Sequence, residues 1–323
     1  MRARIAVHPE KPENKGRQMS GNQVHPRIHL IDLEPGGIRN FAASYIVKGE
    51  KTAIVETGPK ASAPNLLRHI RANHVNPADV AYITVSHIHL DHGGGAGTLM
   101  KEFPHAELIV HRRGKPHLAD PDLLWTRSQE ALKETAHLYG EPEPIPEERI
   151  TAAGDGLILS LGEGVELKVL ETVGHASHHL SFFETSSRSL FPGDAAGIYL
   201  NELDVTVPTT PAPFRLDLAL ASLKRLIDLR PSAVYYSHFG NPQDPLVKLK
   251  GYEEQLQLWA ECAEEGLKEG EGLEAVRRRI LARDLMFSKA ESYVRKHPIF
   301  RETVMYNSVE GVTEYVRNQL ASQ

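Results

Sequence analysis

Apolar positions in the first half of the chain fall into short runs that are separated by polar and turn-forming residues. The clearest run, Val80–Val85, is rich in β-branched residues, is too short for a helix, and lies between Pro77 and a cluster of histidines. Such bounded apolar runs are typical of buried strands. The same pattern predicts further strands at 28–33, 44–47, 53–55 and 108–111, and a helix near Ala61–Asn73.

Helical periodicity dominates the second half of the chain. Phe214–Leu229 follows a Pro-Ala-Pro segment that is suited to begin a helix. Beyond it, residues 243–323 carry helical patterns at Leu246–Leu267, Leu273–Leu285 and Val309–Leu320, without a strand-like run of comparable strength. This part of the chain is therefore expected to be a helical region.

Residues 112–150 form an unusually long connection between predicted strands. They contain an expected helix at Pro121–Tyr139 and then a proline-rich link. Long connections often line a site or act as a lid, so Trp125 together with Arg112 or Arg113 is a candidate for substrate contact. A simple outer helix fits the pattern equally well.

Composition supports a globular chain with a polar start. Residues 1–24 are polar and interrupted by proline and glycine, which predicts an arm outside the core. We therefore expect an arm at 1–24, a strand-rich domain at 25–242 that carries the 112–150 insertion, and a helical region at 243–323. Hydrophobic residues make up 41% of the 323 positions, which is ample for a core.

The sequence gives little indication of membrane insertion, secretion or disulfide formation. No apolar run approaches the roughly 18 residues that a membrane span needs, and Met1–Pro9 lacks the apolar stretch of a secretory signal. Cys262 is the only cysteine, so neither an intramolecular disulfide nor a thiolate metal cluster can form. We expect a cytoplasmic protein without a membrane segment.

Three imidazoles and a carboxylate lie within six residues directly after the strand at 80–85. His87 and His89 point the same way if the chain stays extended, because side chains of an extended backbone alternate with period two. Asp91 and His92 cannot both follow that direction, and the glycines at 93–95 permit a sharp turn. The motif predicts two adjacent metal ions, and a solvated histidine-rich loop is the alternative.

Three later residues follow apolar runs in a similar way. His175, Asp194 and His238 each come directly after a strand-like segment. A lone histidine at a strand end is more often structural, but the first cluster needs partners and sites collect at strand ends in layered α/β folds. These three residues are therefore candidate ligands.

The candidates together resemble the metallo-β-lactamase-fold hydrolases, and the glyoxalase II-like branch in particular, because all seven positions hold His or Asp. The resemblance spans roughly residues 28–242 and implies an αββα sandwich, an α/β fold with a metal pair at one edge of its sheets and here with a helical C-terminal extension. It implies that one ion binds His87, His89 and His175, that the other binds Asp91, His92 and His238, and that Asp194 bridges them. The helical extension is similar to the one that completes the pocket in glyoxalase II-type enzymes.

These ligand types define the expected chemistry. Neutral imidazole and carboxylate suit Zn²⁺, and they also suit Fe or Mn. Two divalent ions activate a bridging water as hydroxide near neutral pH and polarise a carbonyl oxygen. We therefore expect a dinuclear metal-dependent hydrolase of a small ester, thioester or lactone, in which Asp91 also acts catalytically by orienting the hydroxide and passing a proton to the leaving group.

Other residues near the motif have smaller expected roles. Glu56 stands where the family usually has the Asp of an Asp-Thr-Gly turn. Glu56 is therefore expected to lie behind the metal ligands and to orient them. The alternative is that it is a carboxylate at a strand end without a role in the site. His179 lies where glyoxalase II-like sequences often carry a supporting histidine, whereas His178 has no clear counterpart. Neither is assigned as a ligand.

Charge narrows the substrate class. The whole chain has a net charge of −5, and residues 243–323 hold 12 Lys and Arg against 14 Asp and Glu. This balance argues against nucleic-acid binding and favours a small-molecule substrate. Residues 275–301 nevertheless form a basic patch of eight cations and two acids, including Arg279 and Arg283. The patch either binds a small anionic group of the substrate or is a solvated helix face.

Two other function classes stay open. The same fold holds iron in flavodiiron-type proteins and persulfide dioxygenases, so an iron-dependent oxidoreductase or dioxygenase is the alternative. His89 counts against a flavodiiron protein, which usually has an acid there, and residues 243–323 lack the strand–helix alternation of a flavodoxin-like domain. A non-catalytic binding protein is disfavoured by the complete ligand set.

Overall fold

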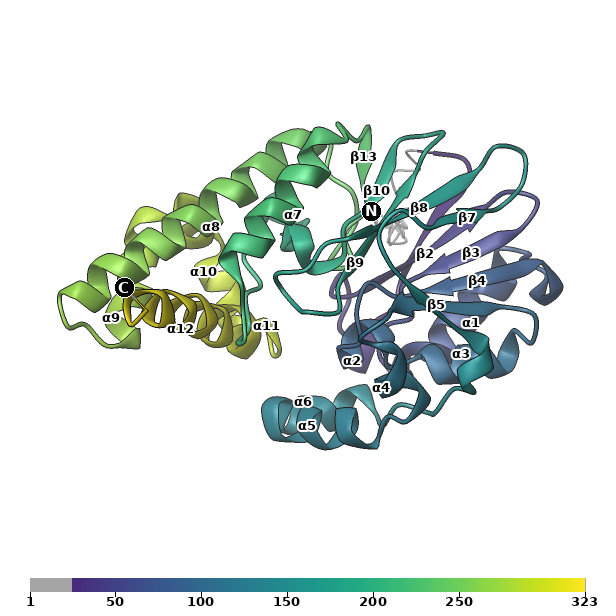
Figure 1. Ribbon diagram of the computed structural model, residues 1–323, viewed down its shortest axis with the longest axis horizontal. Coiled ribbons are helices and arrows are strands. Elements are labelled where there is room, and N and C mark those ends of the chain that lie inside the picture. The colour runs from purple at the N-terminus through teal and green to yellow at the C-terminus, as the bar shows by residue number, and fades with distance from the viewer. Residues whose placement is uncertain (1–24, 323) are drawn as a thin grey trace, which may run out of the picture.

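A computed structural model describes residues 25–322, so the predicted polar arm at 1–24 lies outside the described residues. The chain forms two sheets that pack face to face, with helices on both outer sides (Figure 1). In the first sheet the strands run in chain order, β1 (Ile28–Asp32), β2 (Ala43–Lys48), β3 (Thr52–Val55), β4 (Val80–Thr84), β5 (Glu107–His111) and β6 (Ile150–Ala153). The pairs from β1 to β3 are antiparallel and those from β3 to β6 are parallel.

The second sheet is mainly antiparallel. Its order is β13 (Ala233–Val234), β10 (Ser189–Phe191), β9 (Leu180–Glu184), β8 (Glu166–Glu171) and β7 (Ile158–Ser160). Only β13 runs parallel to its neighbour β10. A separate hairpin pairs β11 (Ile198–Leu200) with β12 (Val205–Val207).

Alternating side chains explain the layers. In β2, Tyr45 and Val47 belong to the core between the sheets, whereas Ile46 belongs to the outer core under the helices. In β9, Phe182 and Phe183 divide in the same way. Because strand side chains alternate between faces, each sheet buries both faces and needs helices outside it. The expected αββα sandwich is confirmed.

The outer layers are formed by helices of different chain regions. Helices α1 (Ala63–Ala72) and α3 (Ala96–Glu102) contact the first sheet, and α7 (Leu216–Asp228) shares its apolar cluster with the outer face of the second. The one-turn helix α2 (Leu90–Gly93) lies at the edge of the sandwich. Short 3-10 turns occur at Pro35–Gly37, Lys60–Ser62, Pro77–Asp79, Glu147–Arg149 and Gly193–Ala196.

The 112–150 insertion departs from the single helix that we expected. It contains α4 (Lys115–Ala119), α5 (Asp122–Leu132) and α6 (Glu134–Tyr139). The break falls at Lys133, whose φ of 51° is incompatible with a continuous right-handed helix. The break turns α6 back towards the sandwich, where it contacts α2 and the turns that begin at Pro35 and Lys60.

The helical C-terminal region is confirmed, with two α-helices, α10 and α11, and a π-helical turn beyond the three helices that the sequence predicted. It comprises α8 (Pro245–Lys268), α9 (Leu273–Arg283), α10 (Leu285–Lys296), α11 (Phe300–Glu302), a π-helical turn (Thr303–Asn307) and α12 (Ser308–Leu320). The pattern Leu273–Leu285 ends early because the Asp284 side chain accepts hydrogen bonds from the backbone N–H groups of Met286 and Phe287. Asp284 therefore caps the start of the additional helix α10.

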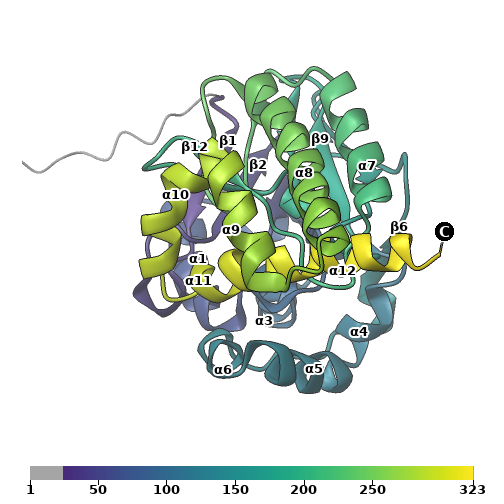
Figure 2. The same ribbon diagram turned by 90° about the vertical axis from the view of Figure 1, so that its left-hand side faces the viewer.

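The insertion and the C-terminal helices reach the same side of the sandwich. Figures 1 and 2 show α5 and α6 below, with α11 and α12 above them. No helix within residues 25–322 is long and apolar enough to cross a membrane. The edge of the sandwich between these two helical segments carries the histidine cluster.

Candidate metal centre

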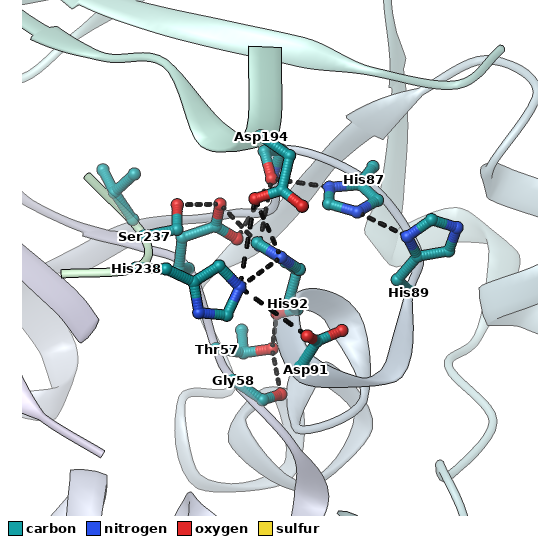
Figure 3. A network of polar contacts seen from close by, with 12 residues as sticks. Thr57, Gly58, His87, His89, Asp91, His92, Asp194, Ser237 and His238 are labelled. Carbon is teal, nitrogen blue, oxygen red and sulfur yellow. Dashed lines mark hydrogen bonds and ion pairs between the residues drawn. The ribbon is translucent and has the colours of Figure 1, made fainter. Parts of the chain in front are cut away.

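The seven residues that the sequence singled out meet at one edge of the sandwich. They follow the ends of four strands: His87, His89, Asp91 and His92 come after β4, His175 after β8, Asp194 after β10 and His238 after β13. Figure 3 shows six of them pointing towards one another. Strands from both sheets therefore contribute to a single cluster.

The first group contains His87, His89 and His175. His87 Nε2 lies 2.8 Å from His89 Nδ1, and His175 Nε2 lies 3.2 Å from the same His89 atom. The backbone at His89 is extended, with φ of −55° and ψ of 148°, just before α2 begins. The extended backbone brings His87 and His89 to the same side, as the period-two argument predicts. The three side chains are close enough to hold one ion.

The second group contains Asp91, His92 and His238. Asp91 and His92 lie within α2, so the chain has turned away from the direction of the first two histidines. His238 Nε2 is 3.2 Å from His92 Nε2 and 3.6 Å from Asp91 Oδ2. Thr57 fixes this turn because its hydroxyl donates to the His92 carbonyl at 2.7 Å (Figure 3). This group is close enough to hold a second ion.

Asp194 lies between the two groups. Its Oδ1 is 3.4 Å from His92 Nε2, and its Oδ2 is 3.4 Å from His175 Nε2. Gly193, directly before it, has a φ of +56°, and a Cβ there would lie 2.5 Å from Ser86 Cβ. Glycine is therefore required for the approach that brings the Asp194 carboxylate to both groups.

Backbone carbonyls orient two of the imidazoles. His175 Nδ1 donates to the Thr209 carbonyl at 2.9 Å, and His238 Nδ1 donates to the Phe41 carbonyl at 2.6 Å. Because the Nδ1 atoms carry these protons, the Nε2 atoms keep their lone pairs and face the cluster. This arrangement is typical of histidines that bind metals.

Glu56 lies behind His92, as the sequence analysis expected. The carboxylate is 2% exposed and its Oε1 is 3.2 Å from His92 Nδ1. It also accepts hydrogen bonds from the Ser237 hydroxyl at 2.9 Å and the Ser86 backbone N–H at 3.3 Å. The longer glutamate side chain therefore reaches the imidazole and has a fixed orientation.

The electrostatics of the cluster favour cations. Burial holds the pKa values of His87, His89 and His175 below the ordinary value, so these imidazoles are neutral. Burial also opposes protonation of His92, but the carboxylates of Asp194, Glu56 and Asp91 outweigh it and raise its pKa to about 10. The carboxylates around His92 thus stabilise positive charge at the position that a metal ion can take.

Asp194 provides a second indication that the residues fit metal ions. Its Oδ1 is buried and has no hydrogen-bond partner among residues 25–322. Burial opposes ionisation, but the neighbouring histidines hold the Asp194 pKa well below its usual range. A buried, ionised carboxylate oxygen without a hydrogen bond is costly unless a cation balances it, either a protonated His92 at 3.4 Å or a metal ion in its place.

His178 and His179 belong to neither group. His179 Nε2 accepts the Asp194 backbone N–H at 3.1 Å, and its Nδ1 is 2.9 Å from the Thr172 hydroxyl. His179 therefore helps to fix the loop that carries Asp194. His178 instead lines the adjoining cavity, and its Nδ1 has no partner among the described residues.

A cavity of about 790 Å³ opens from the cluster. Asp91, Asp194 and His238 lie at its inner end, and its walls come from the insertion, the β12–α7 connection and the C-terminal helices. Phe41, Tyr139, Arg127 and Phe300 line it and were not found from the sequence. Of these, only Arg127 could have been indicated by the sequence, because it shares one helical face of α5 with Leu123, Leu124, Ser128, Ala131 and Leu132.

The insertion lines the cavity through residues other than the predicted substrate contacts. The insertion lines the cavity, but Trp125 lies outside the lining and its ring contacts His137 at 5.9 Å between centroids. Arg112 pairs with Glu171 at 3.1 Å, and Arg113 donates to the Ser177 carbonyl. Ser128, three residues further along α5, does line the cavity.

The basic patch at 275–301 is an ion-paired helix surface. Arg279 pairs with Glu265, Glu269 and Glu271, and Arg283 pairs with Glu261 and Glu265. None of the eight cations of the patch lines the cavity. The patch therefore lies outside this cavity, and its ion pairs favour the alternative of a solvated helix face.

Comparison with known proteins supports both the fold and the region that contains the candidate site. Residues 38–238 match the family described as the metallo-beta-lactamase superfamily. The metallo-beta-lactamase fold-containing protein ST1585 of Sulfurisphaera tokodaii is 30% identical over 235 residues, which cover 71% of this chain and 83% of that protein. Its solved structure has a TM-score of 0.61 and covers 72% of this chain and 85% of that one.

Two further likenesses extend the comparison. The structure of the metallo-beta-lactamase family protein TTHA1429 from Thermus thermophilus is 23% identical in sequence and has a TM-score of 0.65. The alignment covers 92% of this chain and 95% of that one, so the shared fold extends into the C-terminal helices. The N-acyl homoserine lactonase AttM of Agrobacterium fabrum is 33% identical over 113 residues, 35% of this chain and 39% of that protein. The chain belongs to the metallo-beta-lactamase superfamily, whose members are mainly metal-dependent hydrolases.

Proposed function

We propose that the protein is a dinuclear metal-dependent hydrolase of a small ester, thioester or lactone, of the glyoxalase II-like kind. The observation that carries this proposal is the pairing of two histidine-rich groups with Asp194, whose two oxygens face one group each. The superfamily match supports the reaction class. The partial likeness to an N-acyl homoserine lactonase supports an acyl compound as substrate.

In this proposal the two groups are the ligand sets. His87, His89 and His175 would hold one ion, Asp91, His92 and His238 would hold the other, and Asp194 would contribute an oxygen to each. The carboxylates of Asp91, Asp194 and Glu56 offset most of the charge of two divalent ions. Imidazole and carboxylate ligands favour Zn²⁺ and also accept Fe or Mn.

When bound, two such ions lower the pKa of water towards neutral and polarise a carbonyl oxygen. Hydrolysis joins the water oxygen to the acyl carbon, breaks the bond from that carbon to the leaving oxygen or sulfur, and delivers a proton to the leaving group. Asp91 is suited to carry that proton because its carboxylate lines the cavity beside His238.

Tyr139 is suited to orient the substrate. It ends α6, is 2% exposed and lines the cavity. Burial, together with the charges of Asp91 and Asp194, raises its pKa well above the ordinary value. Its hydroxyl therefore stays protonated at neutral pH and can donate a hydrogen bond to a substrate oxygen.

Metal content tests the proposed ligand sets. We expect close to two transition-metal ions per chain, and Asp194→Ala should lose part of the pair because it removes the oxygens that face both groups. Asp204→Ala is a matched control, since that exposed carboxylate pairs with Lys248 away from the cluster. One ion per chain, unchanged by Asp194→Ala, would contradict the dinuclear proposal.

Turnover tests the proposed reaction. A panel of acyl-glutathione, acyl-coenzyme A, lactone and phosphodiester compounds should include metal-dependent hydrolysis of acyl compounds. Asp91→Asn should lose more activity than metal, because the amide keeps an oxygen for the ion but cannot accept a proton. Bound iron with no hydrolysis of any member would instead favour the oxidoreductase alternative.

A further inference from the structure

The walls of the cavity are mainly apolar beyond the metal cluster. Leu124, Leu132, Ile299 and Phe300 line it, although each belongs to one of two helical segments that lie far apart in the sequence. Pro211–Pro213 adds a third apolar wall from the β12–α7 connection. A space of about 790 Å³ lies within the range of roughly 300–1,000 Å³ that small-molecule sites occupy.

Helix α5 presents one of its faces to this space. The lining positions repeat at three- to four-residue spacing from Leu123 to Leu132, whereas Thr126 and Glu130 lie elsewhere on the helix. Leu123 is 50% exposed, although large apolar side chains are usually covered. The exposed leucine lies on the face that lines the cavity, where a bound apolar group would cover it.

Charges in the cavity are sparse. Apart from histidines and from Asp91 and Asp194, Arg127 and Glu310 are the charged side chains among its lining residues, and both are exposed. Their charges are opposite, so neither sign prevails at the walls. A substrate whose non-reacting parts carry several negative charges, such as a glutathione or coenzyme A thioester, would find one arginine in this lining.

We propose that the substrate is a neutral ester or lactone with an apolar acyl chain, and that the chain lies between α5 and the segment Ile299–Phe300. The proposal rests on the proposed hydrolase function and adds its substrate class. The acyl carbonyl reaches the metal cluster, and the chain extends along the apolar walls. Burial of each methylene group contributes about 0.8 kcal/mol, which corresponds to about a fourfold change in kcat/KM.

A chain-length series tests this substrate class. With p-nitrophenyl esters from acetyl to dodecanoyl, kcat/KM should rise by about two- to fourfold per methylene and level off when the cavity is full. Thioesters test the charge argument, because octanoyl-N-acetylcysteamine and octanoyl-coenzyme A share the acyl group and differ in the charge of the leaving thiol. The neutral thioester should react at least about tenfold faster in kcat/KM.

Two adjacent positions of α5 provide a matched pair of variants. Ala131→Trp places a large ring in the cavity, whereas Glu130→Trp places it on a part of the helix that does not line the cavity. Both positions are exposed, so neither change disturbs the core. Ala131→Trp should lower the decanoyl-to-acetyl ratio of kcat/KM by at least about tenfold, whereas Glu130→Trp should leave both the ratio and acetyl turnover within about twofold of wild type.

Binding of hexanamide, octanamide and decanamide, measured by calorimetry, tests the apolar site without hydrolysis. Affinity should increase along the series and fall in Ala131→Trp alone. Equal affinities, a flat ester series, or equal effects of the two tryptophan variants would overturn the acyl-chain proposal. Absence of any ester turnover, together with chain-length-dependent amide binding, would instead contradict the hydrolase function and leave the apolar site supported.

Discussion

Replacement of Glu56 by glutamine should weaken metal binding without removing a proposed ligand. The wild-type carboxylate is 3.2 Å from His92 Nδ1, so it fixes the ring that presents Nε2 to the cluster. Glutamine keeps the shape but loses the charge, and a hydrogen bond to a charged group contributes about 1.5–3 kcal/mol. This agrees with the roughly ten- to hundredfold loss of metal affinity that follows removal of such supporting carboxylates.

The assay is a titration of the metal-loaded protein with a chelator, followed by metal analysis. Glu184→Gln is the matched control, because Glu184 is also 2% exposed and accepts hydrogen bonds from Ser186 and Ser187, but contacts no residue of the cluster. Both variants should lose some stability towards urea, and only Glu56→Gln should release metal at lower chelator concentration. Wild-type metal retention in Glu56→Gln, or an equal loss in both variants, would refute the reasoning.

Three further changes have expected outcomes. Burial lowers the pKa of His297 from an ordinary value of 6.5 to about 4 in the folded protein. The unfolded chain therefore binds this proton more readily, and the folded protein should lose stability as the pH falls from 6.5 to about 4. His297→Asn should reduce the loss of stability between pH 7 and pH 5, measured as the midpoint of urea unfolding. Gly193→Ala should destabilise the protein by more than about 1–2 kcal/mol, the cost of a left-handed backbone at a residue with a side chain, because the new Cβ would also clash with Ser86. Gly164 has a φ of +73° and open space around it, so Gly164→Ala should show the backbone cost alone in denaturant unfolding. Arg279→Glu should lower the urea midpoint and leave the ranking of substrates unchanged, because Arg279 pairs with glutamates outside the cavity; a changed ranking would return the basic patch to the substrate site.

Local patterns were enough for the strands of the first half before the insertion and for the candidates of the cluster, but not for β6, β7, β9, β11 and β12. Strand β4 and the six residues His87–His92 are close together in the chain, so periodicity and spacing describe them directly. The positions of His175, Asp194 and His238 were also visible as polar residues after apolar runs. Their assignment as ligands remains a prediction, but their convergence is a property of the fold.

Helix boundaries were less predictable where a single residue decides them. The pattern Pro121–Tyr139 is continuous in hydrophobicity, but the left-handed backbone at Lys133 divides it into α5 and α6. Similarly, Asp284 ends α9 and begins α10 because its carboxylate caps the next helix. Neither effect changes the apolar periodicity from which the helices were predicted.

The sequence by itself determined several strands and the candidate residues at their ends, because these depend on side-chain periodicity and on motifs within a few residues. The αββα layers were implied by the resemblance to the metallo-β-lactamase-fold hydrolases that those motifs carry. Only the tertiary structure decided what surrounds the candidate residues. It turned one face of α5 towards the cavity and left Trp125 outside, and it paired Arg279 with glutamates of other turns. The physical reason is that a cavity wall or an ion pair depends on the distance between separate helices, and no pattern within one helix specifies that distance.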